Sequence, residues 1–417
     1  MKSVSELIYY YRRYELWQLR KLTRLICSDR NLFCLEVMVP PEELGGGLAL
    51  TGGAYVGPEG GITSTNRWLR FDFNDPNHRS LVILGGTSFT IGDNIVTIDE
   101  TTSYNLSDYI SEEGADYYVF INAEGRVIAS QIRTPAEGYM FIGQFHTLCN
   151  GVPANTTAQF PTDITTTGES VTLCDYFKNQ DLDFANFYTK TIDANNTGSY
   201  YNFATCLHPL QGFNTMDIIP ESVWCLNFHP SCKNWDGMVY CNAGDFAVDI
   251  YLQSGTGQNT RSEYGDVYVS RRQWLNHQND MQIVGKSLLT VSEFMQAAMG
   301  SNERTAITGA RDWSTAGGHV DTANRRMISF IGCEECCGYI WQWTRNDGAL
   351  IERNTWSVDD GRGLMGQSND IITSMFFGGI WTSGFYSGSR CVCCGSPSWS
   401  DVLTGLGARG CCDISIV

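Results

Sequence analysis

The sequence predicts an α+β protein with a helical N-terminus, a β-rich middle domain and a C-terminal domain in which a few helices lie among strands. Residues 3–27 contain neither Gly nor Pro, residues 48–205 show short apolar or alternating runs, and two helical patterns follow among aromatic-rich runs. At 417 residues the chain is too long for one ordinary core. The expected domains are therefore 1–45, 46–205 and 206–417.

The first expected element is the N-terminal helix. Leu7, Tyr11, Tyr14, Leu22 and Leu25 recur at spacings that place them on one helical face. Prolines at positions 40 and 41 and a run of three glycines at 45–47 then end any helix. Two interpretations stay open, an ordinary packing helix and a helix for assembly or attachment.

Charge separates this N-terminus from the rest of the chain. The net charge is −17, yet residues 1–30 hold seven basic and three acidic residues. An acidic chain is poorly suited to bind nucleic acid or an anionic membrane. The sequence has no run of 18 apolar residues and no secretion-signal pattern, so we expect no membrane insertion. Sixteen cysteines leave the redox compartment undecided.

The middle domain is expected to consist of strands. Residues 81–84, 89–91, 94–98 and 117–121 are short apolar or alternating runs bounded by turn residues. Residues 150–198 are rich in Thr and Asn and have weak periodicity. This segment is expected to form long loops or a connector.

Two helices are expected in the C-terminal domain, at residues 269–278 and 290–298. Thr290 is a good N-cap, and Glu293 three residues later completes a capping box. Runs of strands with few helices favour a mixed domain.

Tryptophans and glycines further along the chain indicate a rigid strand framework. Trp341 and Trp343 are two residues apart, which puts both indoles on one face of a strand. Gly378 and Gly379 allow another backbone to come close just before Trp381.

These features occur in a recognisable order: residues 289–298, 338–344, 378–381, 388–390 and 407–410. In this order they resemble the C-type-lectin-like domain shared by formylglycine-generating enzymes and by the variable phage proteins of diversity-generating retroelements, those of the major-tropism-determinant type. Idiosyncratic segments between residues 116 and 321 are also similar to these phage proteins. The resemblance covers roughly residues 115–417.

The resemblance implies a receptor-binding protein of the virion, on a tail tip or capsid surface and assembled as a homotrimer. Its partners would be a host cell-surface protein or glycan and, through the N-terminal region, other virion proteins. It would need no cofactor and would not be an enzyme.

The resemblance also implies that residues 380–406, here called the display segment, are the variable region. The scaffold residues it implies are Trp341, Trp343, Gly378, Gly379, Trp381, Gly384, Gly388, Ser389, Arg390, Trp399 and Arg409. The displayed side chains it implies are Ile380, Thr382, Ser383, Phe385, Tyr386, Cys391, Cys393, Cys394, Ser396, Ser398, Ser400, Asp401, Val402, Thr404 and Leu406. None of the displayed positions holds Lys, Glu, Gln, Met or Trp, as expected if adenines of AAC codons are mutated.

Other functions have weaker support in the sequence. The fold could serve a structural decoration or tail protein without a ligand. Cys391, Cys393 and Cys394 could act as in a formylglycine-generating oxidase, although no motif for a peptide substrate stands out.

A zinc site is a further alternative. Cys333 and Cys336 have Cys-x-x-Cys spacing, and Cys391, Cys411 or Cys412 could complete the ligands. Buried thiols or a long-range disulfide are the more common outcome of such spacing, since a second spaced pair is missing. We therefore expect no metal.

Overall fold

The computed structural model describes residues 67–162, 170–172, 189–198, 201–308, 316–350, 372–384, 387–393 and 405–416. These residues belong to one compact unit, residues 53–417. The predicted helix at residues 3–27 lies outside the described residues, as does the predicted first domain.

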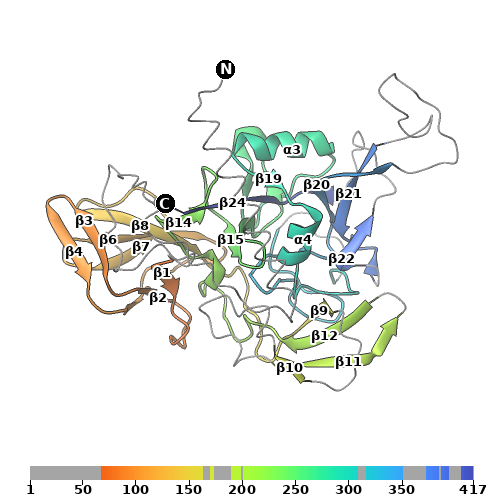
Figure 1. Cartoon of the computed structure of the whole chain (residues 1–417), viewed down its shortest axis with the longest axis horizontal. Helices are drawn as coiled ribbons and strands as arrows, with labels where there is room; N and C mark the ends of the chain where they lie inside the picture. Colours follow the sequence, from red (N-terminus) through yellow and green to blue (C-terminus); the bar gives the residue numbers. More distant parts are fainter. Residues whose placement is uncertain are drawn as a thin grey trace, which may run out of the picture. The chain divides into compact units, whose positions relative to one another are not determined.

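The α+β prediction is wrong, because the described part of the chain is mostly β (Figure 1). Its α-helices are α3 (Trp274–Ile283) and α4 (Val291–Ala297), of 10 and 7 residues. Two 3-10 turns, η3 (Pro220–Ser222) and η4 (Gly257–Asn259), add little. The helices are too short to form a layer of their own, and the abundant aromatic and β-branched residues of the chain favour strands. Neither helix is long and apolar enough to cross a membrane.

The first strands form two small antiparallel sheets. One has the order β1-β2-β5 and the other is the hairpin β3-β4. Their bounds are β1 (Leu69–Phe71), β2 (Ser80–Ile83), β5 (Thr102–Asn105), β3 (Thr87–Ile91) and β4 (Asn94–Ile98). The runs predicted at residues 81–84, 89–91 and 94–98 are thereby confirmed as strands.

The largest sheet has nine strands, in the order β15-β16-β24-β14-β13-β8-β6-β7 with β19 also pairing with β24. Their bounds are β6 (Asp116–Asn122), β7 (Val127–Ser130), β8 (Tyr139–His146), β13 (Trp224–Cys225), β14 (Phe228–Pro230), β15 (Met238–Cys241), β16 (Phe246–Asp249), β19 (Ser287–Leu288) and β24 (Gly410–Ile416). Figure 1 shows β24, in dark blue, running between β14 and β20. The sheet thus joins segments from both sides of the domain boundary expected at 205/206.

The segment expected to be loops contains strands instead. A four-stranded antiparallel sheet has the order β10-β11-β12-β9. Its strands are β9 (Thr157–Thr162), β10 (Ser170–Thr172), β11 (Thr189–Gly198) and β12 (Tyr201–Leu207). Thr is β-branched and favours extended backbone, while its polarity hides the alternation by which a half-buried strand is recognised.

A second four-stranded sheet contains six of the predicted scaffold residues, Trp341, Trp343, Gly378, Gly388, Ser389 and Arg390. Its order is β22-β21-β20-β23, and β23 runs parallel to β20. The bounds are β20 (Trp341–Leu350), β21 (Ile372–Gly378), β22 (Gly388–Cys393) and β23 (Leu406–Gly407), and the short pair β17 (Gln253–Ser254) and β18 (Arg261–Ser262) completes the strands.

Of the two predicted helices, one begins at the expected residue. At the start of α4, Thr290 Oγ1 accepts from Glu293 N at 3.2 Å and Thr290 N donates to Glu293 Oε2 at 2.6 Å, so the capping box is confirmed. The helix predicted at 269–278 begins later, at Trp274. Val269 N instead donates to Gln253 O at 2.8 Å, and Arg271 has a φ of 53°, which no helix accommodates.

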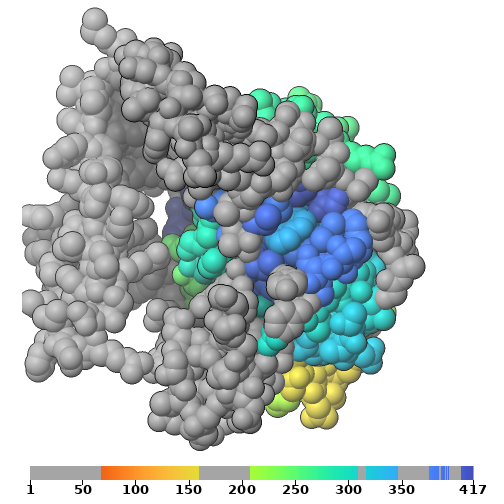
Figure 2. Space-filling model, turned by 90° about the vertical axis from the view of Figure 1, so that its right-hand side faces the viewer, coloured from red at the N-terminus to blue at the C-terminus, as the bar shows by residue number. Residues whose placement is uncertain are grey.

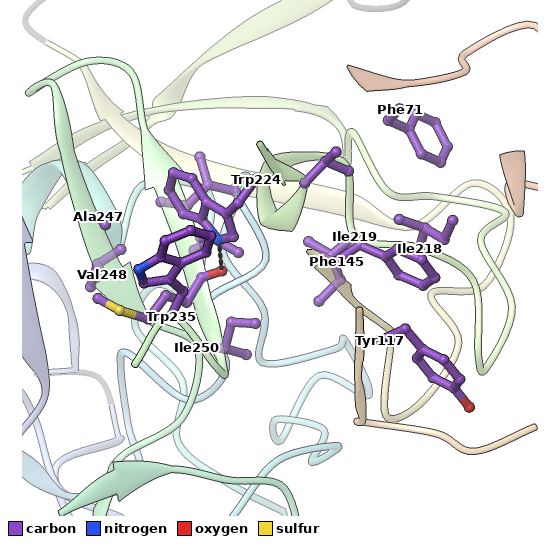
Figure 3. Close-up of a cluster of buried hydrophobic side chains, with 14 of the residues drawn as sticks. Phe71, Tyr117, Phe145, Ile218, Ile219, Trp224, Trp235, Ala247, Val248 and Ile250 are labelled. Carbon is purple, nitrogen blue, oxygen red and sulfur yellow. Dashed lines mark hydrogen bonds between the residues drawn. The ribbon is translucent and has the colours of Figure 1, made fainter. Parts of the chain in front are cut away.

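The main core fills the space beside the nine-stranded sheet. Figure 3 shows Trp224 next to Val248 and Trp235, with Phe145 and Tyr117 further along the same cluster. The indole N–H of the fully buried Trp224 donates to Met238 O at 3.1 Å, so this large side chain leaves no polar group unpaired.

A buried histidine makes the stability of this fold depend on pH. His208 is 1% exposed, its Nδ1 accepts from Leu210 N at 3.0 Å, and its Nε2 donates to Ile328 O at 3.1 Å. These bonds require the neutral ring. Burial lowers the pKa of His208 to about 4 from 6.5.

We expect His208 to destabilise the protein in acid. The unfolded chain binds this proton below pH 6.5, whereas the folded chain binds it only near pH 4. The contribution of neutral His208 to the free energy of unfolding is therefore fully present above pH 6.5 and decreases as the pH falls toward 4. The contribution is up to about 1.4 kcal/mol per pH unit. Urea unfolding of the native protein and of His208→Gln from pH 8 to 4 measures it. Parallel pH profiles for the two proteins would contradict the assignment.

Candidate ligand-binding face

Part of the predicted face lies within the described residues. They include Ile380, Thr382, Ser383, Cys391, Cys393 and Leu406 of the displayed positions. The displayed positions outside the described residues are Phe385, Tyr386, Cys394, Ser396, Ser398, Ser400, Asp401, Val402 and Thr404, together with the scaffold position Trp399. Figure 2 shows the blue surface of the β20–β22 sheet toward the viewer on this side of the molecule.

The display segment begins where two glycines are required. Gly378 ends β21 with a φ of 93°, and a Cβ there would lie 2.3 Å from Cys336 O. Gly338 N donates to Gly378 O at 3.0 Å across this close approach. Gly379, with a φ of 85°, passes equally close to Ser387. Only glycine fits either position, as the sequence predicted for a close backbone approach.

The turn that follows is closed by its own backbone and one side chain. Ser383 N donates to Ile380 O at 2.7 Å, and Ile380 N donates to Ser383 Oγ at 3.1 Å. Thr382, at the tip, is exposed, while Ile380 and Trp381 are half-buried. Ser383 therefore shapes the turn, and Thr382 is exposed, more so than the other residues of the display segment whose side chains the structure describes.

A buried carboxylate that the sequence did not reveal binds the start of β22, the next strand after this turn. Glu303 is 3% exposed, and its Oε1 accepts from Ser389 N at 3.0 Å and from the Ser389 hydroxyl. Arg304 N donates to Ser387 O at 2.7 Å beside it. Glu303 lies in a loop without periodicity, 86 residues from Ser389, so no local signal could identify it.

Behind the display segment, the two tryptophans clamp a phenylalanine. The rings of Trp341 and Trp343 meet Phe376 edge-on, with centroids 5.0 and 5.6 Å apart. Phe376 lies opposite Trp343 on β21. Both indoles thus lie on one face of β20, as predicted from the alternation of side chains along a strand.

Arg409 joins this sheet to the main one. Its buried guanidinium donates to Gln342 Oε1 at 3.1 Å, to Asp249 O at 2.7 Å, and to the carbonyls of Ile250 and Glu334. Gln342 in turn donates to Glu335 O and Cys336 O at 3.1 and 3.0 Å. The guanidinium nitrogens of Arg409 and the amide oxygen and nitrogen of Gln342 all have hydrogen-bond partners, as buried polar groups require.

Leu406 is a correction to the predicted face. Its side chain is 2% exposed and packs in a cluster with Trp274, Met281 and Trp343. Because Leu406 begins β23, which pairs in parallel with β20, its side chain faces the core. It supports the framework and does not reach a ligand.

Cys391 and Cys393 are half-buried on β22, two residues apart. Burial, with smaller contributions from Cys393 and Glu303, raises the pKa of the Cys391 thiol to about 12. A neutral thiol is a poor nucleophile and a poor metal ligand. Cys333, Cys336 and Cys337 are buried free thiols, and among the described residues no group of three His, Cys, Asp or Glu side chains could hold a metal ion.

Comparisons with known proteins place the fold. The sequence matches no protein-family model, and no curated protein matches it. Solved structures do share its fold, and all those named are variants of a tropism determinant.

Three of them are the Major Tropism Determinant I1, U1 and M1 variants. The I1 variant gives a TM-score of 0.60 at 21% identity, covering 88% of this chain and 87% of its own. The U1 variant gives 0.59 at 20%, covering 85% and 86%, and the M1 variant 0.60 at 19%, covering 88% and 86%. The part of the resemblance that concerns proteins of the major-tropism-determinant type is thus confirmed, as a likeness of fold, over most of the chain.

Glu303 is expected to fix the turn through its charge. Glu303→Gln should lower the free energy of unfolding by roughly 1–3 kcal/mol, because a buried donor loses its carboxylate partner. Hydrogen exchange at the Ser389 amide should accelerate. The matched control is Glu263→Gln, whose side chain is 55% exposed. Slow exchange at Ser389 in the Glu303 variant would show that the carboxylate does not hold the turn.

Arg409 is expected to be irreplaceable even by another cation. Lysine has three donors on a single nitrogen and cannot span the acceptors that the planar guanidinium reaches. Arg409→Lys should therefore lower the free energy of unfolding by at least ~2 kcal/mol, because buried acceptors lose their partners. The comparison in urea is with Arg345→Lys, whose side chain is 40% exposed. Equal losses in the two variants would refute this role.

Proposed function

We propose that this protein is a phage virion protein that binds a host-surface ligand through the display segment. The observation that carries the proposal is how the segment is held. In its described part, Glu303 binds the backbone at Ser389 and the glycine pair fixes the backbone just before Ile380, while the Thr382 side chain is exposed. Side chains at such a tip can change without disturbing the groups that hold the turn.

The similarity in fold supports the same conclusion. The solved structures that share the fold are named as determinants of tropism, and this chain covers 86–87% of their length. Carrying that role over to this chain is part of the proposal. So are the lectin-like character of residues 206–417, a homotrimeric assembly, and attachment to the virion through the N-terminal region.

The ligand would be a protein or glycan of the host surface. The displayed positions combine Tyr and Phe with Ser and Thr, which supply rigid contact area and adaptable hydrogen bonds. A surface that varies has no fixed chemistry, so the proposal names the face and leaves the ligand to experiment. Diversification by a retroelement would require a template repeat matching the codons for 380–406 beside a reverse transcriptase gene, and a complete genome with neither would overturn it.

Substituting the exposed tip tests the binding role. Thr382→Trp adds a large ring at an exposed position of the proposed face, and Thr90→Trp adds the same ring at an exposed position of β3. We expect particles carrying Thr382→Trp to adsorb at least tenfold more slowly to the bacterium on which the phage grows, a loss of about 1.4 kcal/mol. Thr90→Trp should adsorb normally.

Both variants should keep the native Tm, because both sites are exposed. Normal adsorption by Thr382→Trp and by a second variant, Thr382→Arg, would favour a structural virion protein without a ligand. Turnover of a cysteine-containing peptide by the purified protein would favour the oxidase alternative.

A further inference from the structure

Two cysteines far apart in the sequence lie opposite each other at the edge of a strand pair. The register of β14 and β24 pairs Phe228 with Ile416 and Pro230 with Ile414. Ser231 N donates to Asp413 O at 2.9 Å, so the same register continues one step beyond the strand. The next pair in this register is Cys232 with Cys412, here called the thiol pair.

The hydrogen-bond pattern sets the spacing of the thiol pair. Because Ser231 bonds directly to the residue opposite, the position after it is a non-hydrogen-bonded pair. At such positions the Cα atoms lie about 4.5 Å apart and the side chains share one face. This is within the range of Cα separations, about 4.4–6.8 Å, that a disulfide bridges.

The two cysteines are free and buried. Both are free cysteines, 6% and 8% exposed, and Cys232 is the neighbour with the largest effect on the pKa of Cys412. Cys232 Sγ also lies 3.0 Å from Asn234 O, which accepts from it.

A buried cation lies beside them. Lys286 Nζ is 2.6 Å from Asp249 Oδ1, and both side chains are almost fully buried. The neighbouring Cys232 thiol, and more weakly the Lys286 ammonium, lower the pKa of Cys412. The thiolate is the attacking species in disulfide exchange, so Cys412 is the better nucleophile of the two.

We propose that Cys232 and Cys412 form a disulfide once the protein meets an oxidising medium. The reaction uses a small-molecule disulfide such as oxidised glutathione. The Cys412 thiolate attacks one sulfur of the oxidant, whose S–S bond breaks and releases the first thiolate. Cys232 loses its proton and displaces the second. Two protein thiols are oxidised, and one oxidant disulfide is reduced to two thiols.

The disulfide would fix the position of β24, the strand that pairs with three others in the large sheet. β24 pairs with β14, β16 and β19, and Arg409 immediately precedes it. Linking Cys412 to the loop after β14 closes a covalent loop of nearly half the chain, and long loops remove the most entropy from the unfolded state. The protein would be more stable after release from a reducing cytosol than inside it.

Peptide mapping without reduction tests the proposal. The full-length protein is held in a buffer of reduced and oxidised glutathione, and a second sample is refolded in the same buffer so that burial does not limit access. We expect a cross-linked peptide joining Cys232 and Cys412. Relative to the dithiothreitol-treated protein, the Tm should rise by roughly 2–5 °C.

Cys232→Ser and Cys412→Ser should each abolish this rise in Tm. Cys411→Ser should retain it, since Cys411 lies on the same strand but its thiol contacts Ser287 and Leu288. The proposal is overturned if both thiols of the pair are recovered free from the folded and refolded samples. It is overturned equally if either thiol retains glutathione as a mixed disulfide.

Discussion

The buried guanidinium of Arg409 is the interaction on which the arrangement of the two main sheets depends. It binds carbonyls at the end of β16 and in the loop before β20, and it binds Gln342 within β20 itself. A cation buried so completely is stable only when its donors are paired, so these segments must occupy one relative position or leave a charge stranded. The framework beneath the display segment therefore has a single geometry.

In this geometry the residues that fix the backbone of the display segment are different from the residues whose side chains are exposed. Glu303 and the pair Gly378 and Gly379 act on backbone groups or on the space the backbone passes through, and they do not depend on which side chain stands at Thr382. The clamp of Trp341 and Trp343 on Phe376 supports the sheet from behind. A loop held in this way can tolerate substitution at its tip, which is what a changeable recognition surface requires.

Features with a local cause were predictable from the sequence, and features with a distant cause were not. The capping box at Thr290, the shared face of Trp341 and Trp343, and the close approach at Gly378 follow from spacing within a few residues. Glu303 could not be found, because its partner is Ser389. Leu406 was assigned to the wrong side, since only its pairing with β20 decides where it points. The Thr-rich strands β9, β10 and β11 lack the apolar alternation that identifies a strand, so the overall class was predicted with too little β structure.

The place of β24 in the large sheet determines when the sheet can form. β14 and β16 are synthesised early, yet both pair with β24, and Phe228 must find Ile416 across most of the C-terminal half of the chain. Pairings so distant in sequence form slowly, because the entropy cost of closing a large loop comes before any stabilising contact is made. Until then two strand edges stay open to other chains. Pairing with β24 within the chain therefore competes with pairing of the open edges of β14 and β16 between chains. Synthesis of many copies in close proximity would favour the intermolecular pairing, which leads to aggregation.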